Sequence, residues 1–397
     1  AHAEQADWPR YWAHLPASSA QRIVLDEAFA ALNSENLQPD LALRAERVLR
    51  PMLEAGRKGR GEAITGKTQA ALDEARAWMF LGELVGAQQS RLQQMYEDER
   101  RGLAMLEQLL PNSSELAQNL SSHGNTLAIL VRYPEAIELK TRALAIHQKA
   151  DGPGHRNTAK SLGGLASLYK DTGQYDKALP LSQRALAISE SADGAESSAT
   201  SAALNNLAML YQAMGQYQRA LPLYERALAI SEKISGPDHP NTAAHLNNLS
   251  SLYEHVGQFA KALTLQERSF AIRSKSQSGD DLTTALNLNN LALPHQRMGH
   301  YAKALPLYER ALAINEQIAG PVHPSTATSL GNLATLLHEM GQDGKATALT
   351  ERALAISEKT EGANHPSTGT RLSNLAALYV LAGQYRKALP LATRALE

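Results

Sequence analysis

The sequence predicts an all-α protein, a right-handed superhelical solenoid built from antiparallel helix hairpins. The first observation is a Gly-x-aromatic triplet with a 42-residue period, beginning at Gly173, Gly215, Gly257, Gly299 and Gly383; Gly341 keeps the period with Asp343 in place of the aromatic residue. The second is that each interval holds two amphipathic helical patterns. The third is a Gly-Pro-x-His-Pro linker between intervals, complete at 236–240 and 320–324 and partly kept at 152–156 and 362–366. A constant period of this length is typical of a stacked array of small units.

The unit from Thr200 to Gly236 shows why each hairpin forms. The apolar stripe of its first helix has helical spacing and consists of Ala203, Leu204, Leu207, Ala208 and Tyr211. We expect Thr200 to cap this helix and Gly215 to end it in the left-handed conformation. The apolar face of the second helix consists of Ala220, Leu223, Tyr224, Ala227 and Leu228. Neither helix can bury its stripe alone, so stacking of neighbours is required.

The period divides the chain into three parts. Residues 117–397 are predicted to form seven hairpins, the last of them truncated because the sequence stops in mid-helix. Residues 75–116 are predicted to form a degenerate hairpin, and residues 1–74 an N-terminal helical cap with helices at 21–32 and 41–55. The linkers at 194–200 and 278–284 lack His-Pro. Pro294 lies inside a first helix, where we expect a kink that frees the carbonyl of Asn290.

Several of these positions resemble a known family. Leu207-Ala208, Tyr211, Gly215-x-Tyr217, Ala220 and Ala227 resemble the tetratricopeptide repeat pattern, over about residues 117–397. The 42-residue period, with Leu-Asn-Asn-Leu in the first helix and His-Pro in the linker, is similar to the kinesin-light-chain type of this repeat. The resemblance implies that one side of each first helix lines a concave groove. The motor function does not follow from it, because this type also occurs in many bacterial repeat proteins.

The groove side of the first helices carries one asparagine per repeat, which we call the asparagine column: Asn206, Asn248, Asn290, Asn332 and Asn374. On a helical wheel these residues lie opposite the apolar stripe. Asparagine in a helix costs roughly 0.5 kcal/mol relative to alanine, but its amide both donates and accepts hydrogen bonds. The resemblance implies that matching asparagines contact cargo peptides. The alternative is that the column holds neighbouring first helices together. For Asn205, Asn247 and Asn289, nearer the packed side, structural bonding is the favoured interpretation.

The remaining groove positions predict the character of the partner. Met209, Leu286 and Leu293 give the groove an apolar middle, and His255 and Arg297 add polar points. Packing between repeats is the alternative role for the three apolar residues. Charges are sparse in this register, so the sequence predicts a weakly charged, partly apolar peptide or protein ligand.

The composition excludes several other classes of function. The 397 residues carry a net charge of −1, which argues against nucleic-acid binding, and they include no cysteine, which excludes disulfides and thiolate chemistry. No apolar run is long enough to span a membrane. We expect no catalysis and no cofactor. The predicted location is the cytoplasm, with a cleaved signal peptide before Ala1 and self-association both left open.

Three further features require interpretation. Residues 61–68 fit the phosphate-loop pattern, but the buried strand that such a loop needs does not precede them, so nucleotide binding is only a remote alternative. The linker histidines recur with the period, as expected of packing or capping groups, and are His155, His239, His323 and His365. An arginine that recurs in the second helices predicts surface ion pairs between repeats. The abrupt end at Glu397 supports a second hypothesis, a sensor or regulatory arm of a larger enzyme or signalling protein.

Overall fold

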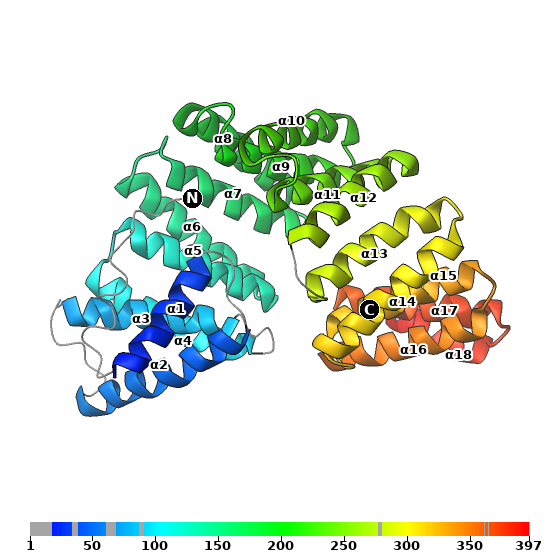
Figure 1. The fold of residues 1–397 in the computed structure, drawn as a ribbon, viewed down its shortest axis with the longest axis horizontal. Coiled ribbons are helices and arrows are strands. Elements are labelled where there is room, and N and C mark those ends of the chain that lie inside the picture. The colour runs from blue at the N-terminus through cyan, green and yellow to red at the C-terminus, as the bar shows by residue number, and fades with distance from the viewer. Residues whose placement is uncertain are drawn as a thin grey trace. The chain divides into compact units, whose positions relative to one another are not determined.

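All the regular secondary structure in the part of the chain that the structure describes is helical (Figure 1). The computed structural model describes residues 18–33, 39–60, 69–86, 91–276, 280–360, 362–363 and 365–396. In these residues the chain forms eighteen α-helices and no β-strand, so the prediction of an all-α protein is confirmed. The chain divides into two compact units, Ala1–Leu210 and Tyr211–Glu397, with the boundary inside α9 (Ser198–Ala213).

The N-terminal unit contains four helix pairs before α9. Their helices are α1 (Ser19–Asn33), α2 (Pro39–Arg60), α3 (Gln69–Gly86), α4 (Leu92–Leu109), α5 (Ser114–Ile129), α6 (Tyr133–Ala150), α7 (Arg156–Asp171) and α8 (Tyr175–Asp193). Each odd-numbered helix packs against the helix that follows it, most extensively in the pairs α3–α4, α5–α6 and α7–α8. The helices predicted at 21–32 and 41–55 are α1 and α2, and the hairpin predicted at 75–116 falls on α3 and α4.

The C-terminal unit continues the same pattern. Its helices are α10 (Tyr217–Ser235), α11 (Pro240–His255), α12 (Phe259–Ser276), α13 (Leu282–Arg297), α14 (Tyr301–Ile318), α15 (Pro324–Glu339), α16 (Asp343–Thr360), α17 (Pro366–Leu381) and α18 (Tyr385–Arg394). Hairpins α11–α12, α13–α14, α15–α16 and α17–α18 each pack internally, and each second helix also contacts the next first helix. Helix α13 continues through Pro294 to Arg297.

Each hairpin from α5–α6 to α17–α18 turns at a residue in the left-handed conformation. At Gly215, φ is +70°, and the amide of the next residue, Gln216, donates to the carbonyl of Tyr211 at 2.8 Å. This arrangement closes the helix end and confirms the predicted role of the glycine. The hairpin α5–α6 lacks that glycine, and Val131 takes its place with φ at +61°. A β-branched residue pays a steric penalty in this conformation.

The linkers show that one predicted cap is wrong. Thr200 does not cap α9; the hydroxyl of Ser197 accepts from the Thr200 amide at 3.1 Å, and Thr200 itself is buried and donates to the carbonyl of Gly194 at 2.7 Å. The threonine sits one turn too far along the helix, where its hydroxyl instead ties the first turn to the linker glycine. The same bond recurs in four other linkers, from Thr158, Thr242, Thr326 and Thr368.

The linker histidines are the actual caps where they are present. Nδ1 of His239 accepts from the amide of Asn241 at 3.1 Å. The other three make the same bond: His155, His323 and His365. Where His-Pro is missing before α13, the carboxylate of Asp281 replaces it and accepts from the Thr284 amide. The predicted capping or packing role of the histidines is therefore confirmed.

The core of each unit is a series of small clusters between successive helices. In the C-terminal unit one such cluster joins Ala243, Leu246 and Ile272, and another is built around the buried ring of Tyr308. The N-terminal unit has a larger cluster that joins α1, α2 and α3 around Phe80 and Trp78. Alanine is frequent in these clusters, as at Ala28, Ala42 and Ala45 in the cluster around Phe80.

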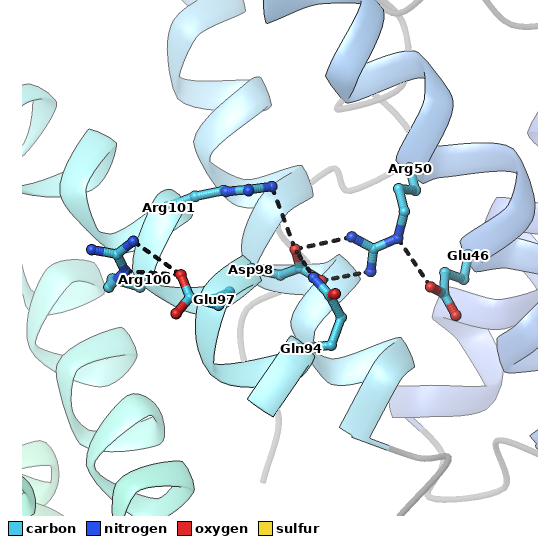
Figure 2. Close-up of polar contacts among 7 residues, drawn as sticks. All are labelled: Glu46, Arg50, Gln94, Glu97, Asp98, Arg100 and Arg101. Carbon is cyan, nitrogen blue, oxygen red and sulfur yellow. Dashed lines mark hydrogen bonds and ion pairs between the residues drawn. The ribbon is translucent and has the colours of Figure 1, made fainter. Parts of the chain in front are cut away.

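A buried ionic network ties α2 to α4 (Figure 2). Asp98 on α4 is fully buried, and both of its oxygens accept from the guanidinium of Arg50 on α2, at 3.1 and 2.7 Å. Arg50 also donates to Glu46 at 3.0 Å, and Gln94 donates to Asp98 at 3.1 Å. Because a buried carboxylate needs such partners, this network fixes the N-terminal helices against the rest of the unit.

Arginines at the recurrent register of the second helices form the predicted surface ion pairs. Their partners are carboxylates of the preceding second helix, as in Arg268–Glu232 and Arg352–Glu316, or of the adjoining linker, as in Arg310–Asp280. These arginine side chains are 39–56% exposed. Each pair therefore contributes little to stability.

Candidate functional site

The asparagine column lies on the open side of the first helices in each unit. In α9 the apolar stripe is buried, including Leu204 and Leu207, whereas Asn206 and Ala202 on the opposite side are exposed. In the C-terminal unit Asn374 is exposed, and Asn248, Asn290 and Asn332 are half-buried. The orientation predicted from the helical wheel is therefore clear at Asn206 and Asn374, and the other three residues of the column are partly exposed.

Most amides of the column are not used within the protein. Among the described residues the side chains of Asn206, Asn290 and Asn374 make no hydrogen bond, whereas Asn248 has an interaction partner. Asn332 donates to Oδ1 of Asn289 at 3.3 Å. Asn332 therefore links two helices. Within the described part of the chain, the other three amides have both their donor and their acceptor unused.

The neighbouring asparagine register has a different character. Asn289 is 8% exposed and donates to the hydroxyl of Ser329 on α15 at 3.0 Å. Asn205 on α9 lies with its Nδ2 3.5 Å from the sulfur of Met209. A single step along the helix turns the amide from the open side toward the adjacent helix, because successive residues are about 100° apart.

Four of the other predicted groove residues lie on first helices of the C-terminal unit that also carry the asparagine column. Leu286 is 57% exposed, and Leu293 is half-buried. Arg297 is exposed on the last turn of α13. His255 is exposed, with Nδ1 2.7 Å from the carbonyl oxygen of Ser251. Met209 belongs to the N-terminal unit and is half-buried.

Several first helices of the C-terminal unit carry near their end a polar side chain that sequence reasoning missed, whereas α17 has Val380 at this position. Gln296 accepts from the buried hydroxyl of Tyr308 at 2.9 Å, and Gln212 accepts from Tyr224 at the same distance. At the equivalent position of α11 stands Glu254, and its burial raises the pKa of its carboxyl to about 7. Aligning the repeats and comparing the residues at each position of the 42-residue period would have identified these side chains.

Lys140 on α6 was also missed. It is 3% exposed, and its ammonium donates to the hydroxyl of Ser121 at 3.3 Å. Burial lowers the pKa of Lys140 to about 8. Gly164 occupies the register of the asparagine column on α7, and a Cβ there would lie 3.1 Å from the Lys140 nitrogen. The glycine therefore leaves the room that the ammonium takes.

Other candidate sites receive less support. The phosphate-loop pattern at 61–68 lies outside the described residues. Within the described ranges, His, Asp and Glu side chains nowhere gather in a group of three that could hold a metal ion. As far as its helices are described, none combines the length and the apolar character that a membrane crossing requires.

Comparison with known proteins identifies the class. The sequence profile of the tetratricopeptide repeat family matches residues 115–191, 199–275, 281–359 and 344–397, and the chain belongs to this family. Its repeats are of the kinesin-light-chain type. A putative kinesin light chain from Podosopora anserina, with nearly identical TPR-like repeats, is 31% identical over 52% of this chain and 98% of its own, with a TM-score of 0.45.

Two solved structures resemble nearly the whole chain. The apo form of the quorum sensor NprR from B. thuringiensis is 16% identical, covers 94% of this chain and 97% of its own, and has a TM-score of 0.57. A Rap protein complexed with competence and sporulation factor is 16% identical, with 96% and 97% coverage and a TM-score of 0.58. At this identity the likeness concerns the fold, which is an all-α repeat solenoid. No curated protein has a sequence that matches the chain.

Proposed function

We propose that the chain is a non-catalytic scaffold that binds an extended peptide segment of another protein along the asparagine column. The observation that carries the proposal is that the amides of Asn206, Asn290 and Asn374 have no partner among the described residues. A purely structural column would use its amides between helices, as Asn289 does with Ser329. Side-chain amides held one period apart match a backbone, which offers both donors and acceptors whatever its sequence.

The surroundings of the column support a ligand with little charge. Leu286 exposes more than half of its side chain beside the column, and His255 and Arg297 are the polar groups near it. Two of the solved structures of this fold are named as a quorum sensor and as a complex with competence and sporulation factor. A binding function is therefore in keeping with the fold.

The test compares two kinds of asparagine. Linear peptides are selected from a random display library against the wild-type protein, and their affinities are then measured by calorimetry. The double variant Asn290→Ala, Asn374→Ala should bind them about tenfold or more weakly, because two hydrogen bonds of about 1 kcal/mol each are lost. Its melting temperature should stay unchanged.

Asn289→Ala is the matched control, one residue away from the column. It should lower the melting temperature, because Asn332 loses its partner and Ser329 keeps only its bond from Asn315, and it should affect peptide affinity less than the double variant. If the double variant melts early and binds the selected peptides normally, the column is structural and the proposal fails.

A further inference from the structure

A pocket lies between the second helices α12 and α14, over the start of α13, and we call it the outer pocket. Its volume is about 340 Å³, and its lining includes Ser274 of α12 and Arg310 of α14. The residues of the asparagine column do not line it. Its volume is within the range of sites that bind small molecules. The proposed peptide-binding function makes no use of this pocket.

The outer pocket stands where other repeats place a glutamate. Ser274 has the register of four glutamates in other second helices: Glu190, Glu232, Glu316 and Glu358. Three of these carboxylates pair with the arginine of the next second helix, as Glu232–Arg268, Glu316–Arg352 and Glu358–Arg394. Arg310 has the register of those arginines, but the hydroxyl of Ser274 is too short and uncharged to pair with it. The space of a glutamate side chain is therefore open here.

Arg310 keeps most of its hydrogen-bonding capacity. Its Nη2 donates to Oδ1 of Asp280 in the linker at 2.8 Å. The pair is exposed, with 56% of the Arg310 side chain and 45% of the Asp280 side chain accessible. A guanidinium has five N–H donors, so Arg310 can hold a second acceptor without releasing Asp280.

A second cation lines the outer pocket from α12. Arg273 is the only arginine at its register, which elsewhere carries His147, Ser189, Ser231, Asn315 and Ser357. It is half-buried, and burial lowers the pKa of its guanidinium, whereas the charge of Asp281 acts in the opposite direction. Oδ1 of Asp281 is already engaged as the cap of α13, where it accepts from the amide and the hydroxyl of Thr284 at 2.6 and 2.8 Å. A further anion in the pocket would offset the cost of burying this cation.

A buried amide also lines the outer pocket. Asn287 is 4% exposed, and its side chain makes no hydrogen bond among the described residues. In other hairpins this register is satisfied by the preceding second helix, as Ser161 is by His147 and Ser329 by Asn315. A buried amide without a partner is costly, and its N–H groups can donate to an acceptor in the pocket.

These groups favour a carboxylate over other ligands. The planar fork of an arginine matches the two oxygens of a carboxylate, as in the Arg–Glu pairs of the other repeats. The carboxylates of Asp280 and Asp281 nearby disfavour an anion with more than one charge, such as phosphate. Phe270 lines the pocket at a register where Leu228 and Leu312 stand elsewhere, and its ring offers an apolar surface to the rest of the ligand.

We propose that the outer pocket binds a small organic carboxylate, whose carboxyl group takes the place of the missing glutamate beside Arg273, Arg310 and Asn287. The apolar part of the ligand packs against Phe270. The bound carboxylate then joins α12 to α14, as a glutamate does in other repeats. This site is separate from the asparagine column, and the proposal does not rest on peptide binding.

The test uses two probes of the same shape, 3-phenylpropionate and its uncharged analogue 3-phenylpropionamide. Their affinities for the wild-type protein are measured at pH 7 by ligand-observed NMR titration. The acid should bind about tenfold or more tightly than the amide, because hydrogen bonds between charged groups are about twice as strong as neutral ones.

Ser274→Glu supplies the missing carboxylate from the protein itself. It should weaken the binding of 3-phenylpropionate about tenfold or more, and the melting temperature should not fall, because Arg310 gains the partner that Arg352 has in Glu316. The matched control is Thr264→Glu, which adds the same charge at an exposed position of α12. It lies ten residues, or about 15 Å, away along the helix. At this distance salt screens the charge, so the affinity should change less than about twofold.

Arg273→Gln provides a second variant if Ser274→Glu does not fold, and it should also weaken binding about tenfold. The proposal is overturned if the acid does not bind, if acid and amide bind equally, or if both variants bind the acid as wild type does. Tighter binding of inorganic phosphate than of 3-phenylpropionate would overturn the assignment to a carboxylate.

The groove variant Asn290→Ala, Asn374→Ala distinguishes this proposal from peptide binding. It should bind 3-phenylpropionate as tightly as wild type, because neither asparagine lines the outer pocket. Loss of the probe in that variant would place the ligand in the groove and overturn the proposal. Normal binding of library-selected peptides by the same variant would instead contradict the function of the asparagine column, so the two proposals can fail separately.

Discussion

Replacing Lys140 with methionine should stabilise the protein at neutral pH. Lys140 is 3% exposed, the hydroxyl of Ser121 is its hydrogen-bond partner, and burial lowers its pKa from 10.5 to about 8. A shift of this size means that holding the charged form in the folded state costs about 3 kcal/mol at pH 7. Methionine has a similar length and no charge. The lost hydrogen bond to Ser121 offsets about 1 kcal/mol, so the net gain should be about 2 kcal/mol.

The gain should depend on pH in a defined direction. Between pH 8 and 10.5 the folded state has released the Lys140 proton, whereas the unfolded chain still binds it. Because the unfolded state then binds more protons, the stability of the wild-type protein rises with pH over this window. The penalty of the buried charge falls to about 1 kcal/mol at pH 10. The advantage of Lys140→Met should therefore be full below pH 8 and nearly absent at pH 10.

The assay is urea unfolding of wild type and Lys140→Met at pH 7 and pH 10, together with an NMR titration of the Lys140 side chain. Lys160→Met, at an exposed lysine on α7, controls for general effects of removing a positive charge. The reasoning is refuted if Lys140→Met is no more stable than wild type at pH 7. An equal advantage at both pH values, or a Lys140 titration near 10.5, would refute it as well.

Two further predictions concern the fold. Val131→Gly should raise the melting temperature by removing a steric penalty of roughly 1 kcal/mol, since Val131 has φ of +61°. The reverse change at an equivalent turn, Gly341→Ala at φ of +74°, should lower the melting temperature. Equal melting temperatures of Val131→Gly and wild type would show that the turn carries no strain. Arg50→Met should destabilise the protein by about 3 kcal/mol in urea unfolding, because Asp98 is left buried without its main partner. Arg394→Met removes an exposed pair with Glu358 and should cost less than about 1 kcal/mol, so similar losses in the two variants would contradict the importance of the network in Figure 2.

Much of the fold could be predicted because its signals are local and repeated. The turn glycines, the apolar stripes and the outward register of Asn206 all follow from spacing within a single hairpin. A helix fixes the direction of each side chain relative to its neighbours by about 100° per residue. Repetition of the same spacing along the chain then shows that the pattern is real. The capping error at Thr200 arose from the same local reasoning, because the helix begins earlier than the stripe suggests.

The sequence by itself determined the class of protein, the placement of its hairpins and the residues that form the asparagine column. Tertiary structure alone decided which of those amides are used, as the bond from Asn289 to Ser329 on the next hairpin shows. It also decided that Lys140 is buried beside Gly164, that Arg50 meets Asp98 and that a pocket opens beside Ser274. The physical reason is that the environment of a side chain in a solenoid is supplied by neighbouring repeats. The repeat period predicts the direction in which a side chain points, but the residues that it contacts belong to neighbouring repeats.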